Sequence, residues 1–431
     1  MFNTKRKAKW SLLVNGALAS FVLYFCMYAF RKPFSVATFE GIIFLGIDFK
    51  IVLILSQVVG YMLSKFIGIK VISSLQAKNR AVYLVIMILV AELSLVLFGL
   101  LPRPYNFILF FFNGLSLGMI WGIVFSYLEG RKTTEILSIV LCSSFIVSSG
   151  AVKSVGLCLM STLEVTQFWM PAVTGALFLV PFMAALWFLE KLPPPTIEDM
   201  VLRKKRSPMG PADRKKLLGQ YALPLSVLVI FYVALTALRD FRDNFSRELW
   251  DSIGYQENLG VYTYAEIPIT ILVLVLLGLF GLVKSNHKAF IGFHFLFILS
   301  CSLIGLATLF FERGLLSPLY WMIAVGFGMY ACYVPFNSIF FDRMIAAFRM
   351  NGNAGFLIYI ADSFGYLGSM AVLLYKNFGQ ANISWLKFFM GALYALAILG
   401  IITSAISLIL LQRKYTRIKS NVTINMASIN G

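Results

Sequence analysis

Residues 222–238 read ALPLSVLVIFYVALTAL, an uninterrupted apolar run that ends at Arg239 and Asp240. Residues 51–62, IVLILSQVVGYM, have the same character. Such runs suit membrane helices of about 20 residues, whereas the strands of a transmembrane barrel alternate in polarity over about ten residues. Both runs therefore predict helices that span a membrane.

The composition extends this prediction to the whole chain. Of its 431 residues, 59% are hydrophobic and only 13% are charged, whereas soluble proteins are roughly 25% charged. We expect an all-α polytopic membrane protein with twelve transmembrane helices. The apolar segments lie at residues 10–30, 49–69, 81–101, 105–128, 136–160, 168–190, 221–241, 259–283, 289–311, 317–340, 353–375 and 384–411.

The basic residues gather on one side of these predicted spans. The side that carries both termini holds 25 Lys and Arg residues, and the opposite loops hold eight. By the positive-inside rule the rich side is cytoplasmic. The net charge of +18 thus reflects topology in the inner (plasma) membrane, and we expect no nucleic-acid partner.

A polar linker at residues 191–220 divides the chain into two predicted six-helix halves, residues 1–190 and 221–431, the second ending in a short basic tail. Residues 29–31 (AFR) match residues 237–239 (ALR) at an offset of 208, and residues 117–119 match 327–329 at an offset of 210. Such repeats are typical of transporters with a binding site between their halves.

Four basic residues lie inside or at the ends of predicted spans: Arg31, Lys65, Lys153 and Arg239. Each would cost about 2.5–3.5 kcal/mol in lipid, so we expect them to face inward. Arg31 and Arg239 occupy matching repeat positions. Because a guanidinium forms two parallel hydrogen bonds with phosphate or carboxylate, the pair predicts an anion site between the halves.

Other side chains could complete or neutralise this site. Tyr24 and Tyr28 share the helical face of Arg31, and Lys65 shares one with Tyr61. Either lysine could instead reach the headgroups. Asp240, Asp243, Glu266 and Asp362 are possible counter-charges, and Glu266, Asp362 and Asp243 could also carry a proton.

Two stretches, YAFRKPF at residues 28–34 and GYMLSKFI at residues 60–67, resemble the first two helices of the organophosphate:phosphate antiporters of the major facilitator superfamily, the glycerol-3-phosphate transporters in particular. Weaker matches include Gly118-Met119 with Trp121, Leu238-Arg239, and residues 353–356 (NAGF) and 364–368 (FGYLG).

The resemblance implies the major facilitator fold and exchange of a small anionic substrate against phosphate. It also implies a central phosphate site on Arg31 and Arg239, lined by Lys65, Tyr24, Tyr28, Tyr61, Trp121, Tyr330 and Tyr366. Two departures bear on substrate and coupling. Ser144 stands where that family has a histidine, and Lys153 is an added basic residue.

We therefore predict a secondary active transporter, a monomer without cofactor or metal, that moves an organophosphate or phosphate by alternating access. Two alternatives remain open: a proton-coupled symporter of a carboxylate or sugar, and a transport-inactive sensor that signals through the linker. An enzyme is not expected, because His287 and His294 belong to no metal-spacing or acid–base motif.

The charge distribution generates a topology prediction. A cysteine introduced at Ser207 in the linker should resist an impermeant thiol reagent in intact cells and react after permeabilisation, because the positive-inside rule places the linker in the cytoplasm. Labelling in intact cells would place the linker outside the cell and contradict the predicted orientation.

Overall fold

The computed structural model of this chain describes residues 2–131, 133–196, 211–348, 350, 354–379 and 382–429. The middle of the predicted linker, residues 197–210 with Ser207, lies outside the described residues, as does Asn353 of the family resemblance. The described chain is almost entirely helical, as its hydropathy predicts.

The first half of the chain supplies seven helices to the expected six spans. The fourth span, residues 105–128, is divided into two helices by a break at Gly118 and Met119. A Cβ on Gly118 would collide with Ser64, which lies in the helix over Phe49–Ser74. The helices are α1 (Phe2–Ala29), α2 (Phe49–Ser74), α3 (Arg80–Leu100), α4 (Ile108–Leu117), α5 (Ile120–Leu128), α6 (Thr134–Thr162) and α7 (Met170–Glu190), with 3-10 turns η1 (Pro33–Val36), η2 (Ala77–Asn79) and η3 (Tyr105–Phe107).

The second half adds six long helices and two short ones. Its first and last helices exceed the predicted spans, because their polar extensions carry no hydropathy signal. The helices are α9 (Pro211–Asn244), α10 (Ser246–Ser252), α11 (Val261–Gly281), α12 (Asn286–Glu312), α13 (Pro318–Ser338), α14 (Phe340–Ala347), α15 (Ala354–Leu374) and α16 (Trp385–Ile429), with a π-helical turn η4 (Tyr375–Gly379) after α15.

Eleven segments of the described chain are long and apolar enough to cross a membrane, and Leu13–Ala29 of α1 is a shorter apolar helix. They fall on the twelve predicted segments. The chain is therefore a multi-pass membrane protein by length and composition of its helices.

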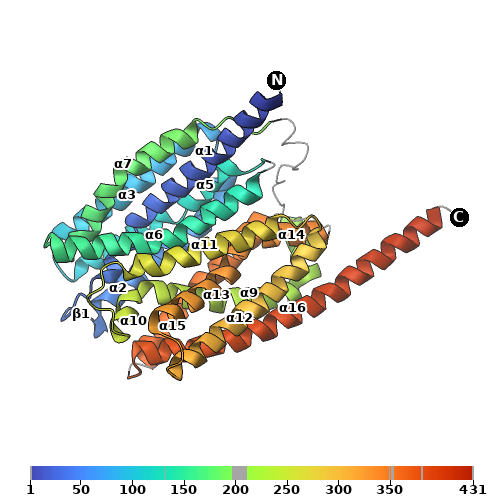
Figure 1. Ribbon diagram of the computed structural model, residues 1–431. Coiled ribbons are helices and arrows are strands. Elements are labelled where there is room, and N and C mark those ends of the chain that lie inside the picture. Colours follow the sequence, from blue (N-terminus) through green and yellow to red (C-terminus); the bar gives the residue numbers. More distant parts are fainter. Residues whose placement is uncertain are drawn as a thin grey trace.

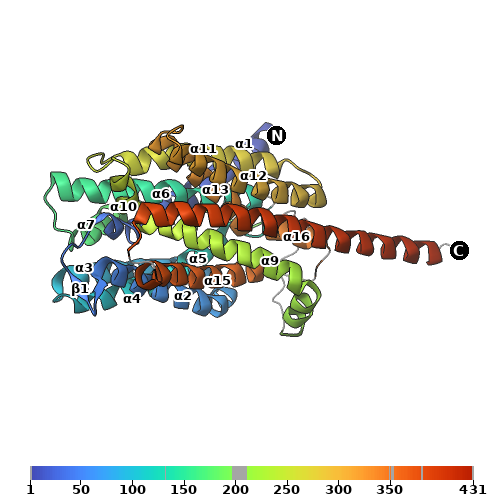
Figure 2. The same cartoon turned by 90° about the horizontal axis from the view of Figure 1, so that it is seen from below.

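The helices form two bundles that lie side by side (Figure 1), one built from α1–α7 and the other from α9–α16. The most extensive contacts between them are those of α6 along α11 and of α2 against α15, and α6 also packs against α13. Figure 2 shows α16 running well past the other helices at its C-terminal end. The contact between halves is thus made by long helices from each bundle.

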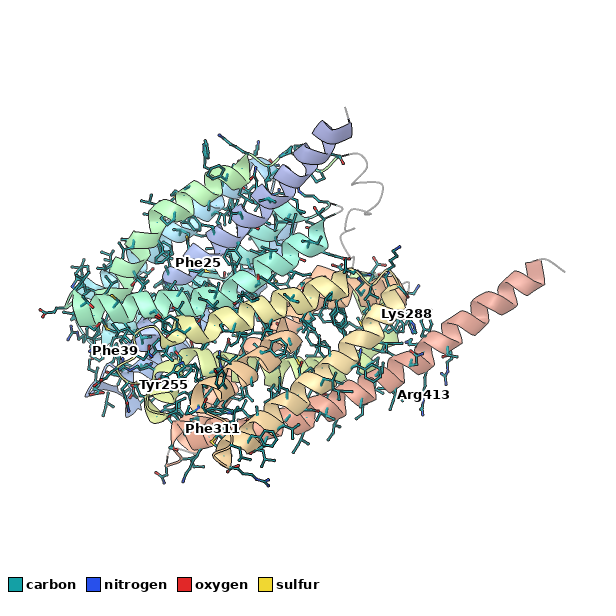
Figure 3. All side chains as sticks on the ribbon, in the orientation of Figure 1. Phe25, Phe39, Tyr255, Lys288, Phe311 and Arg413 are labelled. Atoms are coloured by element: carbon teal, nitrogen blue, oxygen red, sulfur yellow. The ribbon has the colours of Figure 1, made fainter. Side chains whose placement is uncertain are left out.

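Both termini lie at one end of the bundles, whereas β1 and α10 lie at the other end (Figure 1). Lys288 and Arg413 lie at the end with the termini, and Phe39 and Tyr255 at the opposite end (Figure 3). We call these the termini end and the hairpin end. Their positions agree with an even number of membrane crossings.

A short β-hairpin with two residues in each strand gives the hairpin end its name. Strands β1 (Ile43–Phe44) and β2 (Ile47–Asp48) pair antiparallel, with Ile43 opposite Asp48. Asp48 then begins α2, because its carboxylate accepts a hydrogen bond of 2.9 Å from the backbone N–H of Lys50. This cap fixes Lys50 at the first turn of α2.

The close approach of α6 and α11 depends on Gly150. A Cβ built on Gly150 would overlap the backbone carbonyl of Tyr262 on α11. Only glycine therefore allows the two halves to meet here, and backbone cannot yield as a flexible side chain can.

This contact generates a stability prediction. Gly150→Ala should lower the free energy of unfolding by about 1–3 kcal/mol, since overpacking forces the helices apart. Thermal unfolding in detergent would measure it. Gly278→Ala on α11 is the control, because no described atom lies within 4 Å of its added methyl. Equal stability of the two variants would contradict the contact.

Candidate functional site

The two predicted arginines are buried where the halves meet. Arg31 follows the end of α1 and is 5% exposed, and Arg239 lies on α9 and is 8% exposed. The Arg31 guanidinium lies 3.9 Å from the ring centroid of Tyr61, and that of Arg239 lies 4.0 Å from the ring of Tyr333. Each cation therefore rests on a tyrosine of its own half.

Two further tyrosines lie close to both arginines. Tyr28 and Tyr366, one from each half, both interact electrostatically with Arg31 and with Arg239. The Tyr61 and Tyr366 rings lie 5.0 Å apart across the boundary between halves, and the Tyr24 and Tyr28 rings lie 5.7 Å apart. These contacts bring the two arginines and four predicted tyrosines into one region.

The two arginines differ in how their charge is balanced. Arg239 forms an ion pair of 2.5 Å with Asp240, which also accepts a hydrogen bond of 2.8 Å from Ser369. Within the described chain, Arg31 forms no ion pair with a carboxylate, and its Nε has no hydrogen-bond partner. The Asp240 carboxylate interacts electrostatically with Arg31 but forms no ion pair with it. Arg31 is thus a buried cation to which an anion could supply a direct counter-charge.

The backbone of Arg31 is held firmly. Gln57 donates a hydrogen bond of 3.0 Å to the Arg31 carbonyl and another of 2.8 Å to Asn113. Asn113 in turn donates to the carbonyls of Phe30, at 3.0 Å, and Ala91, at 3.3 Å. This network of hydrogen bonds fixes the position of the backbone from which the Arg31 side chain extends.

Lys65 has a carboxylate partner, Asp362 of the opposite half, at 3.2 Å. Tyr232 also donates a hydrogen bond to Asp362. The Lys65 ammonium lies 5.6 to 5.7 Å from the rings of Tyr61, Trp121 and Tyr359. Lys65 therefore does not reach the headgroups. It joins the halves beside Tyr61, the tyrosine under Arg31.

Lys153 lies in a second charge cluster, nearer the hairpin end. It is 3% exposed and pairs at 2.5 Å with Asp243. Lys32 pairs with the same carboxylate at 2.5 Å and donates a 2.8 Å hydrogen bond to Asn244. Ser149 also donates to Asp243. Two lysines of the first half thus share one carboxylate of the second, and Lys153 is neither at the headgroups nor without a partner.

The remaining predicted residues lie around the two arginines and the Asp243 cluster. Glu266 pairs with Arg242 at 2.6 Å, and a small enclosed cavity lies between them, Lys153 and Asp243. Tyr330 interacts electrostatically with Arg239 and Glu266, and Trp121 stacks on Phe125 with centroids 5.1 Å apart. All the predicted proton carriers, Glu266, Asp362 and Asp243, are therefore engaged in ion pairs.

Ser144, which stands where the sequence resemblance implies a histidine, donates a hydrogen bond of 2.6 Å to the carbonyl of Leu141 in its own helix. Its hydroxyl is fully buried. This position therefore supplies no group that titrates near neutral pH.

Several residues of these clusters are not predicted from the sequence, because they lie at or just outside the ends of the apolar runs. Lys32 and Arg242 fall in predicted loops and Lys50 at the very start of the predicted span 49–69, yet all three are buried and paired, Lys50 with Glu248 at 2.5 Å. Tyr333 and Tyr232 lie inside apolar runs, where a tyrosine has no distinctive signal. The helical spacing of Arg239, Arg242 and Asp243 could have indicated one polar patch on α9.

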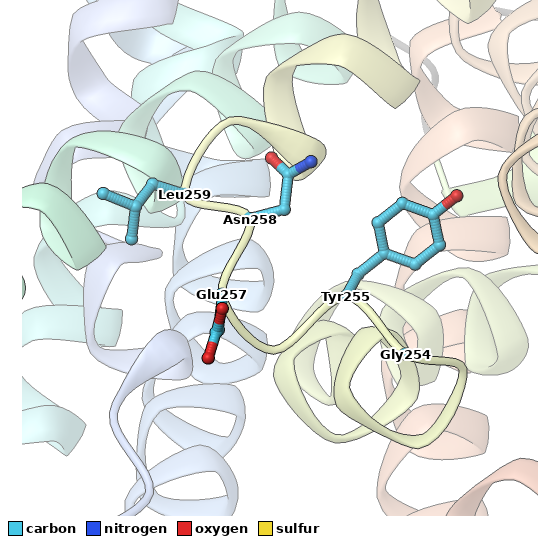
Figure 4. Close-up of a pocket in the computed structure, with 5 residues that line it drawn as sticks. All are labelled: Gly254, Tyr255, Glu257, Asn258 and Leu259. Atoms are coloured by element: carbon cyan, nitrogen blue, oxygen red, sulfur yellow. The ribbon is translucent and has the colours of Figure 1, made fainter.

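A separate hollow lies at the hairpin end, in the loop between α10 and α11 (Figure 4). Gly254, Tyr255, Glu257, Asn258 and Leu259 line it. None of the predicted site residues belongs to it. It is a feature of the loop surface and not of the contact between halves.

Comparison with solved structures identifies the fold. A bacterial homologue of the human drug peptide transporters PepT1 and PepT2 matches with a TM-score of 0.61 and 12% identity, over 94% of this chain and 99% of that one. A point mutant of the nucleoside transporter NupG matches with a TM-score of 0.55 and 15% identity, over 92% and 98%. The D-xylose-proton symporter matches with a TM-score of 0.59 and 11% identity, over 92% and 97%. The chain has the major facilitator fold.

The family is also defined. Residues 33–414 match the Family of unknown function DUF5690, and the chain belongs to that family. A search of the curated proteins by sequence found no match. The family match includes Lys65, Lys153 and Arg239 but begins two residues after Arg31.

The Asp243 cluster generates a stability prediction. Asp243→Asn should destabilise the protein by about 3–5 kcal/mol, because it leaves two lysines buried without a counter-charge. Adding Lys153→Met should restore part of the loss. Thermal unfolding of both variants would measure this, with exposed Glu257→Gln as control. An unchanged melting temperature for Asp243→Asn would rule out the paired arrangement.

Proposed function

We propose that this chain is a secondary active transporter of a small anion, an organophosphate or phosphate, which it binds between its halves and carries by alternating access. The observation that carries the proposal is Arg31. It is a buried guanidinium without a carboxylate partner in the described chain, and it shares Tyr28 and Tyr366 with Arg239 of the other half.

The geometry suits a tetrahedral oxyanion. Arg31 could donate two parallel hydrogen bonds, and Arg239 could do so after partial release from Asp240. Tyrosine hydroxyls can donate to remaining oxygens. Since Arg239 is already neutralised, the site has one excess positive charge and gains most from an anionic ligand.

Ion pairs at both ends support alternating access. Lys32–Asp243 and Lys50–Glu248 join the halves toward the hairpin end, and Arg343 of α14 pairs with Glu135 of α6 at 3.0 Å toward the termini end. A cycle that opens each end in turn must break one set while keeping the other. These pairs are hydrophilic and can be hydrated when opened.

The antiport of an organophosphate against phosphate follows from the sequence resemblance, and the inner membrane with cytoplasmic termini follows from the charge distribution. Symport of a proton with a carboxylate or sugar is the second candidate, and one relative by fold is a D-xylose-proton symporter. Glu266, Asp362 and Asp243 all have basic partners here, so none of these three acids is a free proton carrier in this conformation.

The test is a pair of conservative substitutions. Arg31→Lys and Arg239→Lys should each weaken phosphate binding by at least about tenfold, because the charge stays but the two-donor fork is lost. Binding to purified protein and exchange of labelled phosphate in preloaded liposomes would measure this. Arg247→Lys is the matched control, since Arg247 pairs only locally with Asp251 on α10. Near-normal affinity in either site variant would refute the two-arginine site.

A further inference from the structure

One acid inside a membrane-spanning helix differs from the acids of the contact between halves. Asp240, Asp243, Glu266 and Asp362 each pair with a basic side chain. Glu92 on α3 forms no ion pair with any described residue, and its buried Oε2 has no hydrogen-bond partner there. It lies twelve residues from Arg80 and eight from Leu100, the ends of its helix.

The carboxyl group of Glu92 lies against α7, at the position of Gly175. A Cβ on Gly175 of α7 would overlap Oε2 of Glu92, and it would approach a ring carbon of Phe30 to 3.0 Å. Glycine at position 175 therefore makes room for the carboxyl group beside Phe30. This contact borders an outward-facing apolar surface, because Leu89 and Leu93 of α3 and Leu177 of α7 are 48 to 56% exposed.

No charged neighbour compensates Glu92. Within the described chain, none of the titratable side chains on α3 or on the elements packed against it interacts electrostatically with the Glu92 carboxyl group. Helix α4 carries no titratable side chain. The titratable side chains on the other elements are Arg80 and Tyr83 of α3, Lys78 of η2, Tyr105 of η3, Tyr127 of α5 and Glu190 of α7, with Tyr24, Cys26 and Tyr28 on nearby α1. An ionised carboxylate without a partner is strongly disfavoured at this depth, whereas the neutral acid is tolerated.

Helix α3 is linked to the anion site at this same level. Asn113 bonds the carbonyl of Ala91, which precedes Glu92, and the carbonyl of Phe30, whose ring lies beside Gly175. Gln57 joins Asn113 to the carbonyl of Arg31. A movement of α3 relative to α7 would therefore also move the backbone that carries Arg31.

We propose that Glu92 is a proton-binding site within the membrane, neutral in this conformation, and that its protonation is coupled to the position of Arg31. On ionisation the carboxylate must leave its apolar place beside Gly175 and Phe30 for water or a cation, and α3 must shift with it. The Asn113 and Gln57 hydrogen bonds carry that shift to Arg31. The coupling rests on the proposed anion site, whereas the proton site does not.

The proton site is tested with dicyclohexylcarbodiimide, an apolar reagent that enters the bilayer and attacks protonated carboxyl groups. Purified protein in lipid nanodiscs should gain an adduct on Glu92, identified by peptide mass spectrometry, and the adduct should decrease as pH rises. Glu92→Gln should abolish it, and exposed Glu257→Gln should leave it unchanged. Absence of the adduct from folded wild-type protein at acid pH would overturn the proposal.

The coupling is tested on the same samples with inorganic phosphate. Phosphate should change the rate of Glu92 labelling at least twofold in wild-type protein, and a pH gradient should drive phosphate accumulation in liposomes of wild type but not of Glu92→Gln. An unchanged rate with phosphate bound would refute the coupling. If phosphate does not bind at all, the proposed anion site fails, and the adduct still decides whether Glu92 binds a proton.

Discussion

The cost of placing charge in hydrocarbon determines how the two halves of this protein meet. Lys32 and Lys153 of the first half share Asp243 of the second, and Lys65 pairs with Asp362. Buried pairs of this kind add little net stability, because desolvation offsets their attraction, but each partner is costly to leave alone. Charge therefore fixes which faces meet, while the hydrophobic and glycine contacts of α6 with α11 fix how closely.

Arg31 matters because it departs from this pattern. Every other cation considered between the halves has an acid partner, whereas Arg31 lies over the Tyr61 ring, with no carboxylate partner in the described chain. A cation–π contact contributes on the order of 0.5–2 kcal/mol, which is less than the desolvation of a guanidinium costs. On the proposed function, a bound anion supplies the direct counter-charge that Arg31 lacks in the described chain. Arg239 already has Asp240, so an anion that reaches both arginines would compete with that carboxylate for the same donors.

Much of the fold could be predicted because a membrane helix needs about 20 apolar residues, and all twelve apolar segments coincide with helices. The polar extensions of α9 and α16 could not, since a helix in water leaves no hydropathy signal. At the site, the repeat position of Arg31 and Arg239 indicated the pair. The partners of Lys153 and Lys65 required the three-dimensional packing, because Asp243 and Asp362 are 90 and 297 residues away in sequence. Glu92 carries the same sequence signal as Lys65 and Lys153, a charge inside an apolar run, but only the packing shows that it has no basic partner among the described residues.

The positions of the clusters along the chain suggest how anion binding and opening could act on each other. Arg31 and Lys32 are consecutive, and Arg239 and Asp243 are one helical turn apart on α9. An anion that draws Arg31 and Arg239 together therefore acts on the two segments that also carry the Lys32–Asp243 pair. On the proposed function, a bound anion would add attraction between these segments at the site and so favour the closed Lys32–Asp243 pair toward the hairpin end. Without the anion, two guanidinium groups from opposite halves repel, and only the neighbouring acids hold the segments together. On the proposed function, the same short segments thus bind substrate and close one end, so that occupancy and closure need no separate device.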